Sequence, residues 1–76
     1  MYNIKEIITS ILEDCGFGKE GLTFGFVDFS NDFRLWMQVE TKDGPIAQVW
    51  SLSIMTIKEF YSSIEYLQDE YLIANA

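Results

Sequence analysis

The hydrophobic pattern at the start of the chain predicts an amphipathic helix over residues 3–15. Six apolar residues share one stripe at helical spacing: Ile4, Ile7, Ile8, Ile11, Leu12 and Cys15. Asn3 is a suitable N-cap, and Glu6 three residues later predicts a capping box. Tyr2 and Ile7 occupy the two positions of a hydrophobic staple. Gly16 is expected to end the helix in the left-handed conformation.

Alternating apolar and polar residues then predict three strands, over residues 22–29, 33–41 and 46–52. Short turns join them, so the sheet is expected to be antiparallel. A second helix follows, and no linker or repeat interrupts the pattern. We therefore expect one α+β domain over residues 1–76, in the order α-β-β-β-α, with both helices on one face of a three-stranded antiparallel sheet.

The register of the first two strands depends on their turn. A two-residue loop at Asn31 and Asp32 would pair Phe24 with Val39 and Phe26 with Met37, so that apolar residues meet on one face. A three-residue loop would instead set Gly25 opposite Met37 and lose this match. The first register is preferred.

The third strand can face in two ways. A loop at Asp43 and Gly44 directs Ile46, Gln48, Trp50 and Leu52 toward the core, whereas one more loop residue would turn Ala47 and Val49 inward. The first choice buries more apolar surface and is preferred.

The second helix should begin after Thr56 and run to about Leu72. Thr56 and Glu59 predict a capping box, and Met55 and Phe60 a staple. The expected buried stripe is Ile57, Phe60, Tyr61, Ile64, Leu67 and Tyr71. The expected solvent face is Lys58, Glu59, Ser62, Ser63, Glu65, Asp69 and Glu70.

With both helices on one side, the other side of the sheet has no covering element. It is expected to carry Thr23, Gly25, Val27, Phe29, Arg34, Trp36, Gln38, Glu40, Ala47, Val49 and Ser51. The preferred register places Val27 across from Trp36 and Phe29 across from Arg34. Because Trp and Arg are frequent in binding hot spots, this face is a candidate protein-binding surface.

Charge narrows the class of partner. The 76 residues include 12 Asp and Glu, 5 Lys and Arg and no His, for a net charge of −7. This charge disfavours nucleic-acid phosphates and anionic lipid. A basic protein is the expected partner, and a role of the charge in solubility alone is the alternative. Cys15 is the only cysteine, and no long apolar stretch or leader is evident. These features predict a cytoplasmic protein.

Candidate chemistry is sparse, so neither an enzyme nor a cofactor is expected. Without His, acid–base catalysis would need a buried carboxyl group. Asp28 has the inward parity, opposite Leu35, although a strand-end Asp more often reaches water or turn amides. Cys15 lies on the apolar stripe at a helix C-terminus, where the helix dipole disfavours a negative charge, and is expected to be a core residue.

Two further motifs lack the pattern that their chemistry needs. Gly16, Gly18 and Lys19 do not have the spacing of a phosphate-binding loop. Asp28, Asn31 and Asp32 do not fit a calcium loop, so no metal site is expected.

The second helix carries a second candidate binding surface: Glu59, Glu65, Tyr66, Asp69 and Glu70. Acidic residues interleaved with Tyr can meet Arg or Lys through charge and stacking together. A solvated helix face is the alternative.

In size, acidity and element order the chain resembles small phage-encoded inhibitor proteins, the anti-CRISPR group among them, and also small bacterial immunity proteins. The resemblance implies an acidic protein that blocks a basic, nucleic-acid-handling partner by occupying its surface. A homo-oligomer that associates around Trp36 is the alternative function.

Overall fold

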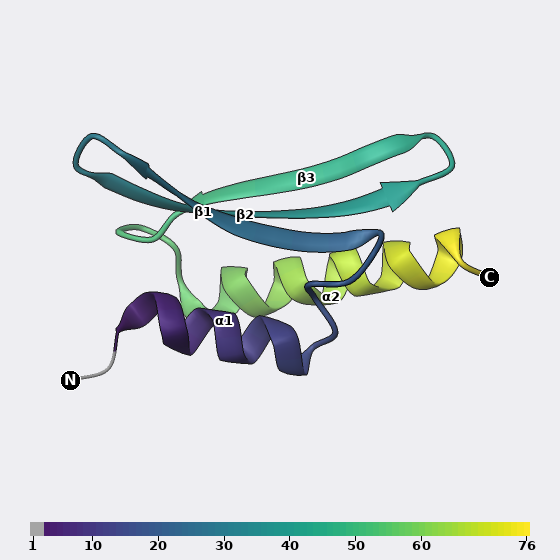
Figure 1. Ribbon diagram of the computed structural model, residues 1–76, viewed down its shortest axis with the longest axis horizontal. Coiled ribbons are helices and arrows are strands. Elements are labelled where there is room, and N and C mark those ends of the chain that lie inside the picture. The colour runs from purple at the N-terminus through teal and green to yellow at the C-terminus, as the bar shows by residue number, and fades with distance from the viewer. Residues whose placement is uncertain (1–2) are drawn as a thin grey trace.

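The computed structural model describes residues 3–76 and has two layers, a sheet and a pair of helices (Figure 1). In chain order the elements are α1 (Ile4–Asp14), β1 (Leu22–Phe29), β2 (Asp32–Thr41), β3 (Gly44–Ser51) and α2 (Ile57–Ala74). The sheet is antiparallel with the order β1-β2-β3. Both helices lie on the same side of it, which confirms the predicted α+β fold.

The sequence signals for the helix ends are largely confirmed. Asn3 caps α1, but its side chain accepts from Lys5 N at 2.9 Å and so does not form the predicted box with Glu6. Gly16 has a φ of +92° after the end of α1, as expected of a residue that ends a helix. The predicted staple involves Tyr2, which lies outside the described residues.

The start of α2 has the complete predicted capping box. Glu59 N donates to Thr56 Oγ1 at 3.1 Å, and Thr56 N donates to Glu59 Oε1 at 3.0 Å. Two backbone donors at the helix end are therefore satisfied. Met55 packs against the core cluster that contains Phe60, in agreement with the predicted staple.

The hydrophobic core lies between the sheet and the helices. Leu35, Met37 and Val39 of the central strand β2 are completely buried. The rest of the core is Ile8, Leu12, Phe17, Leu22, Phe60, Ile64 and Leu67. Every element except the edge strand β3 contributes a fully buried apolar side chain, so one continuous core holds the two layers together.

The predicted facing of the strands is confirmed, but the register of β1 against β2 is shifted by two residues. Phe24 pairs with Met37, whereas Val39 was the predicted partner. The reason is that the turn consists of Ser30 and Asn31 only, since Asp32 is already the first residue of β2. Ser30 takes the left-handed φ of +57° at this turn. A shift of two residues preserves the parity of a strand, so the apolar face is unchanged.

The same shift occurs at the second turn. Thr41 pairs with Gly44, so the loop is Lys42 and Asp43 and not the predicted Asp43 and Gly44. Trp50 pairs with Leu35 and joins the core side, which confirms the preferred facing of the third strand.

The predicted solvent and core faces of α2 need three corrections. Ser63, expected in solvent, is 4% exposed, because its hydroxyl accepts a 2.9 Å hydrogen bond from the Trp50 indole N–H. Ile57 and Tyr61, expected in the core, are 77% and 50% exposed. The buried stripe of α2 is therefore rotated toward β3 and away from α1.

Candidate functional site

The side of the sheet opposite the helices is centred on Trp36. Gly25, not the predicted Val27, is its partner on β1. The indole lies so close to Gly25 that an added Cβ would be 2.6 Å from its Cε2 atom. The absence of a side chain at Gly25 thus provides the space in which Trp36 packs, and the indole is only half-exposed.

Apolar side chains surround Trp36 on this side. Val49 is its partner on β3 and is 58% exposed. Val27 is exposed across from Arg34, a pairing that was predicted for Phe29. Phe29 is 62% exposed, with the Arg34 guanidinium carbon 5.5 Å from the centre of its ring. We call these five residues, Val27, Phe29, Arg34, Trp36 and Val49, the sheet surface.

Asp32 fixes the arginine of the sheet surface. Its carboxylate accepts from Ser51 Oγ and, at 2.7 Å, from Arg34 Nε. The hydrogen bond from Ser51 and then that from Arg34 hold the pKa of Asp32 below its ordinary value. The ion pair is exposed to water, so its main effect is to orient the guanidinium over Phe29.

The acidic residues of α2 form the second candidate surface. Glu65, Tyr66 and Asp69 are exposed, whereas Glu59 and Glu70 are half-buried. Glu59 is also engaged in the capping box of α2. We call the five residues the acidic helix surface.

The structure does not bring the two predicted surfaces together. The core residues Leu35 and Met37 face the helices, so the alternate positions of the sheet surface face away from them. The acidic helix surface belongs to α2, in the helix layer of Figure 1. A single flat partner surface could not contact both at once. They are therefore two separate candidate sites.

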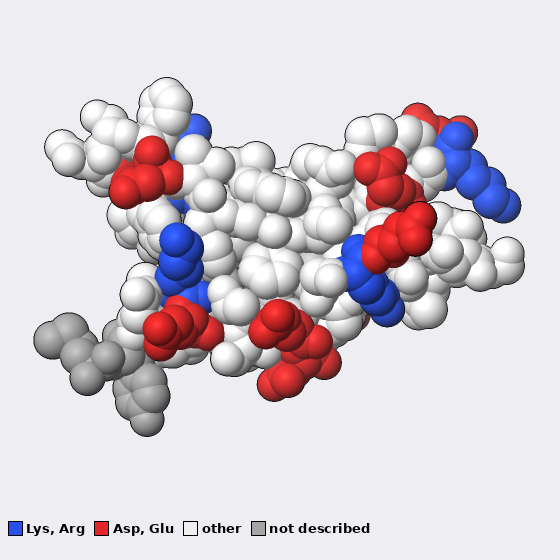
Figure 2. All heavy atoms as spheres, viewed as in Figure 1, with Lys and Arg blue, Asp and Glu red and all other residues white. Residues whose placement is uncertain are grey.

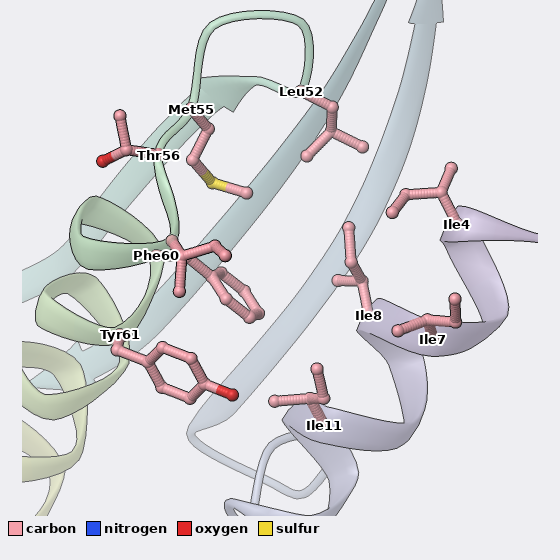
Figure 3. A pocket seen from close by; sticks show the side chains of 10 residues that line it. Ile4, Ile7, Ile8, Ile11, Leu52, Met55, Thr56, Phe60 and Tyr61 are labelled. Atoms are coloured by element: carbon pink, nitrogen blue, oxygen red, sulfur yellow. The ribbon is translucent and has the colours of Figure 1, made fainter.

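A third feature, an apolar groove between the two helices, was not predicted from the sequence. One wall consists of four isoleucines of α1: Ile4, Ile7, Ile8 and Ile11. The other consists of Ile57, Phe60 and Tyr61 of α2, and the loop before α2 closes one end (Figure 3). We call this cavity of about 350 Å³ the interhelical groove.

The sequence feature that could have indicated the groove is the large number of isoleucines in and near the two helices. Ile4, Ile7 and Ile57 are exposed, although all three belong to apolar stripes that were assigned to the core. Ile54, in the loop before α2, is 76% exposed. The sheet therefore leaves part of both apolar stripes uncovered.

The candidate catalytic and metal-binding residues are not assembled into a site. Asp28 pairs with Phe33 instead of the predicted Leu35 and is exposed, in agreement with the expectation that a strand-end Asp reaches water. Cys15 packs partly against the core, and its carbonyl accepts from Gln68 Nε2 at 2.8 Å. Among residues 3–76, no three His, Cys, Asp or Glu side chains are close enough together to hold a metal ion.

One view of the molecular surface shows where charged groups gather on that face. Figure 2 shows acidic and basic side chains mostly at the margins of one view, with a broad uncharged band between them. Within the described part of the chain, neither helix combines the length and apolarity that crossing a bilayer requires.

These features define a small α+β protein with three exposed surfaces that suit contact with another molecule. Comparison of the chain with protein-family models, with curated proteins and with solved structures gives no significant match.

Proposed function

We propose that this chain is a non-enzymatic acidic protein-binding module that blocks a basic, nucleic-acid-handling protein in the cytoplasm, the role implied by its resemblance to phage-encoded inhibitors and immunity proteins. The observation that carries the proposal is the exposure of Glu65, Tyr66 and Asp69 on the outer side of α2. The net charge of −7 on a chain of this size adds a negative electrostatic potential that attracts a basic partner toward these groups.

The acidic helix surface supplies the two contributions that such binding needs. Its carboxylates attract a basic partner over a distance and so accelerate encounter, an effect that salt weakens. Tyr66 adds a ring on which an Arg guanidinium can stack. Surface recognition of this kind needs no reacting group.

The test is capture of a partner by the tagged full chain, followed by charge reversal. Glu65→Lys together with Asp69→Lys should abolish capture, and rising salt should weaken capture by the unchanged protein. Glu13→Lys with Glu20→Lys is the matched control, because both residues are exposed, lie outside α2, and give the same change in net charge. Capture that survives Glu65→Lys with Asp69→Lys at high salt would contradict the proposal.

The exposed Val49 and Phe29 favour self-association through the sheet surface as a second candidate function. Light scattering after size exclusion distinguishes the two. A dimer that Val49→Lys dissociates supports the second candidate, and a monomer at high concentration argues against it.

A further inference from the structure

The interhelical groove is an uncovered apolar cavity in the helix layer. Ile57 is 77% exposed, Ile4 55% and Tyr61 50%, whereas Ile8 and Phe60 beneath them belong to the core. Exposed apolar side chains that gather in one concave place mark a binding site more reliably than the same residues scattered.

The shape of the groove fits a helix. Its walls are two helices, and the side chains of Ile7, Ile11 and Tyr61 border the space between them (Figure 3). Ile4 and Ile11 are seven positions apart, or about 10 Å at 1.5 Å per residue, which matches about two turns of an added helix. Beyond the groove, Gln68 of α2 donates a hydrogen bond to the carbonyl of Cys15, the C-cap of α1.

The charges around the groove indicate what kind of helix it accepts. The described side chains that line it are uncharged. Asp14 follows Ile11 by three residues and Glu65 follows Tyr61 by four, so both exposed carboxylates lie one turn beyond the walls. An occupant therefore meets an apolar centre and acidic residues at one end.

We propose that the interhelical groove binds a short amphipathic helix of the partner, with its apolar stripe between α1 and α2 and its Lys or Arg side chains near Asp14 and Glu65. This mode of binding is helix-in-groove recognition. The inference rests on the proposed function, because it identifies how the acidic module would hold a basic protein. A second copy of the chain is a poorer occupant, since each copy carries a net charge of −7.

The test uses two synthetic Leu/Lys peptides of equal composition and about 14 residues, a length at which a helix is marginal until it binds. One places Leu at helical spacing to form a stripe, and the other distributes Leu so that no stripe exists. Titration calorimetry with the full chain should give a one-to-one complex with the first peptide and affinity at least about tenfold lower for the second.

Matched variants locate the binding site. Ile57→Asn should lower the affinity for the peptide with the Leu stripe by about tenfold, and Ile4→Asn should also lower it. Leu72→Asn, at a similarly exposed apolar residue of α2 that does not line the groove, should leave the affinity unchanged. Circular dichroism checks that each variant is folded, which is expected because these side chains are largely exposed.

Several results would overturn the inference. Equal affinity for both peptides would show that charge alone drives binding, and an unchanged affinity for Ile57→Asn would place binding elsewhere. A dimer that Ile57→Asn dissociates would show that a second copy occupies the groove. Failure of the proposed function is a separate result: partner capture would survive Glu65→Lys with Asp69→Lys whatever the peptides do.

Discussion

Gly25→Ala tests the packing of the sheet surface most sharply, because the Trp36 side chain decides whether the substitution stabilises or destabilises the fold. Gly25 is not among the glycines with a left-handed φ, so the backbone accepts alanine. In a strand, alanine would then stabilise by about 0.5–1 kcal/mol relative to glycine. Trp36 reverses this expectation, because the new Cβ would be 2.6 Å from ring carbons that need about 3.5–4.0 Å.

The indole must therefore move and lose its contacts with β1. Overpacking of this kind costs about 1–3 kcal/mol. For a domain of this size that corresponds to a fall in Tm of roughly 4–24 °C. Thermal and urea unfolding followed by circular dichroism measures the change.

A double-mutant cycle with Trp36→Val separates the steric clash between the new Cβ and the indole from other effects of Gly25→Ala. In a Trp36→Val background, Gly25→Ala should be neutral or stabilising, because the clash is gone and only the strand preference remains. Unchanged stability of Gly25→Ala in the native background, or the same loss in both backgrounds, would refute the packing of Trp36 on Gly25.

The remaining predictions concern single polar contacts. Ser63→Ala should cost about 1–2 kcal/mol in urea unfolding, because the half-buried Trp50 indole N–H loses its buried acceptor, and Trp50→Phe should make the substitution nearly silent. Thr56→Ala should cost about 1 kcal/mol by loss of the α2 cap, and an unchanged midpoint would contradict the capping box. The pKa of Asp32 is lower in the folded chain than its unfolded value of about 3.9, so its contribution to stability is complete above that pH and is lost as the pH falls through the folded pKa. Ser51→Ala should raise the pKa of Asp32 toward its ordinary value in a carboxyl-carbon NMR titration, and a pKa that does not rise would show that the hydrogen bond is not its cause.

Strand facing was predictable from the sequence, whereas strand register was not. Side chains alternate between the two faces of a strand, so the apolar pattern alone places Leu35 and Met37 on the core side. A register shift of two residues leaves this facing unchanged. The register depends on which residues make the turn, and here Asp32 joins β2 through bonds to Arg34 and Ser51. Ser51 lies 19 residues away in the sequence, so local turn preferences give no indication of this contact.

The candidate sites, too, were only partly predictable from the sequence. The residues of the sheet surface follow from parity, but the slot at Gly25 that holds Trp36 depends on the register. Helical periodicity finds the apolar stripe of α2 without saying how far it is rotated. Ser63 is buried because it satisfies the Trp50 indole, and Ile57 and Tyr61 are left beside α1 to form the groove.

The most direct test of the account is an NMR map of the isotope-labelled chain in complex with its captured partner. The account predicts shift changes and slowed amide exchange along α1 and α2, centred on Ile7, Ile57 and Tyr61 and extending to Glu65. Changes confined to Trp36 and its neighbours on the uncovered side of the sheet would contradict it.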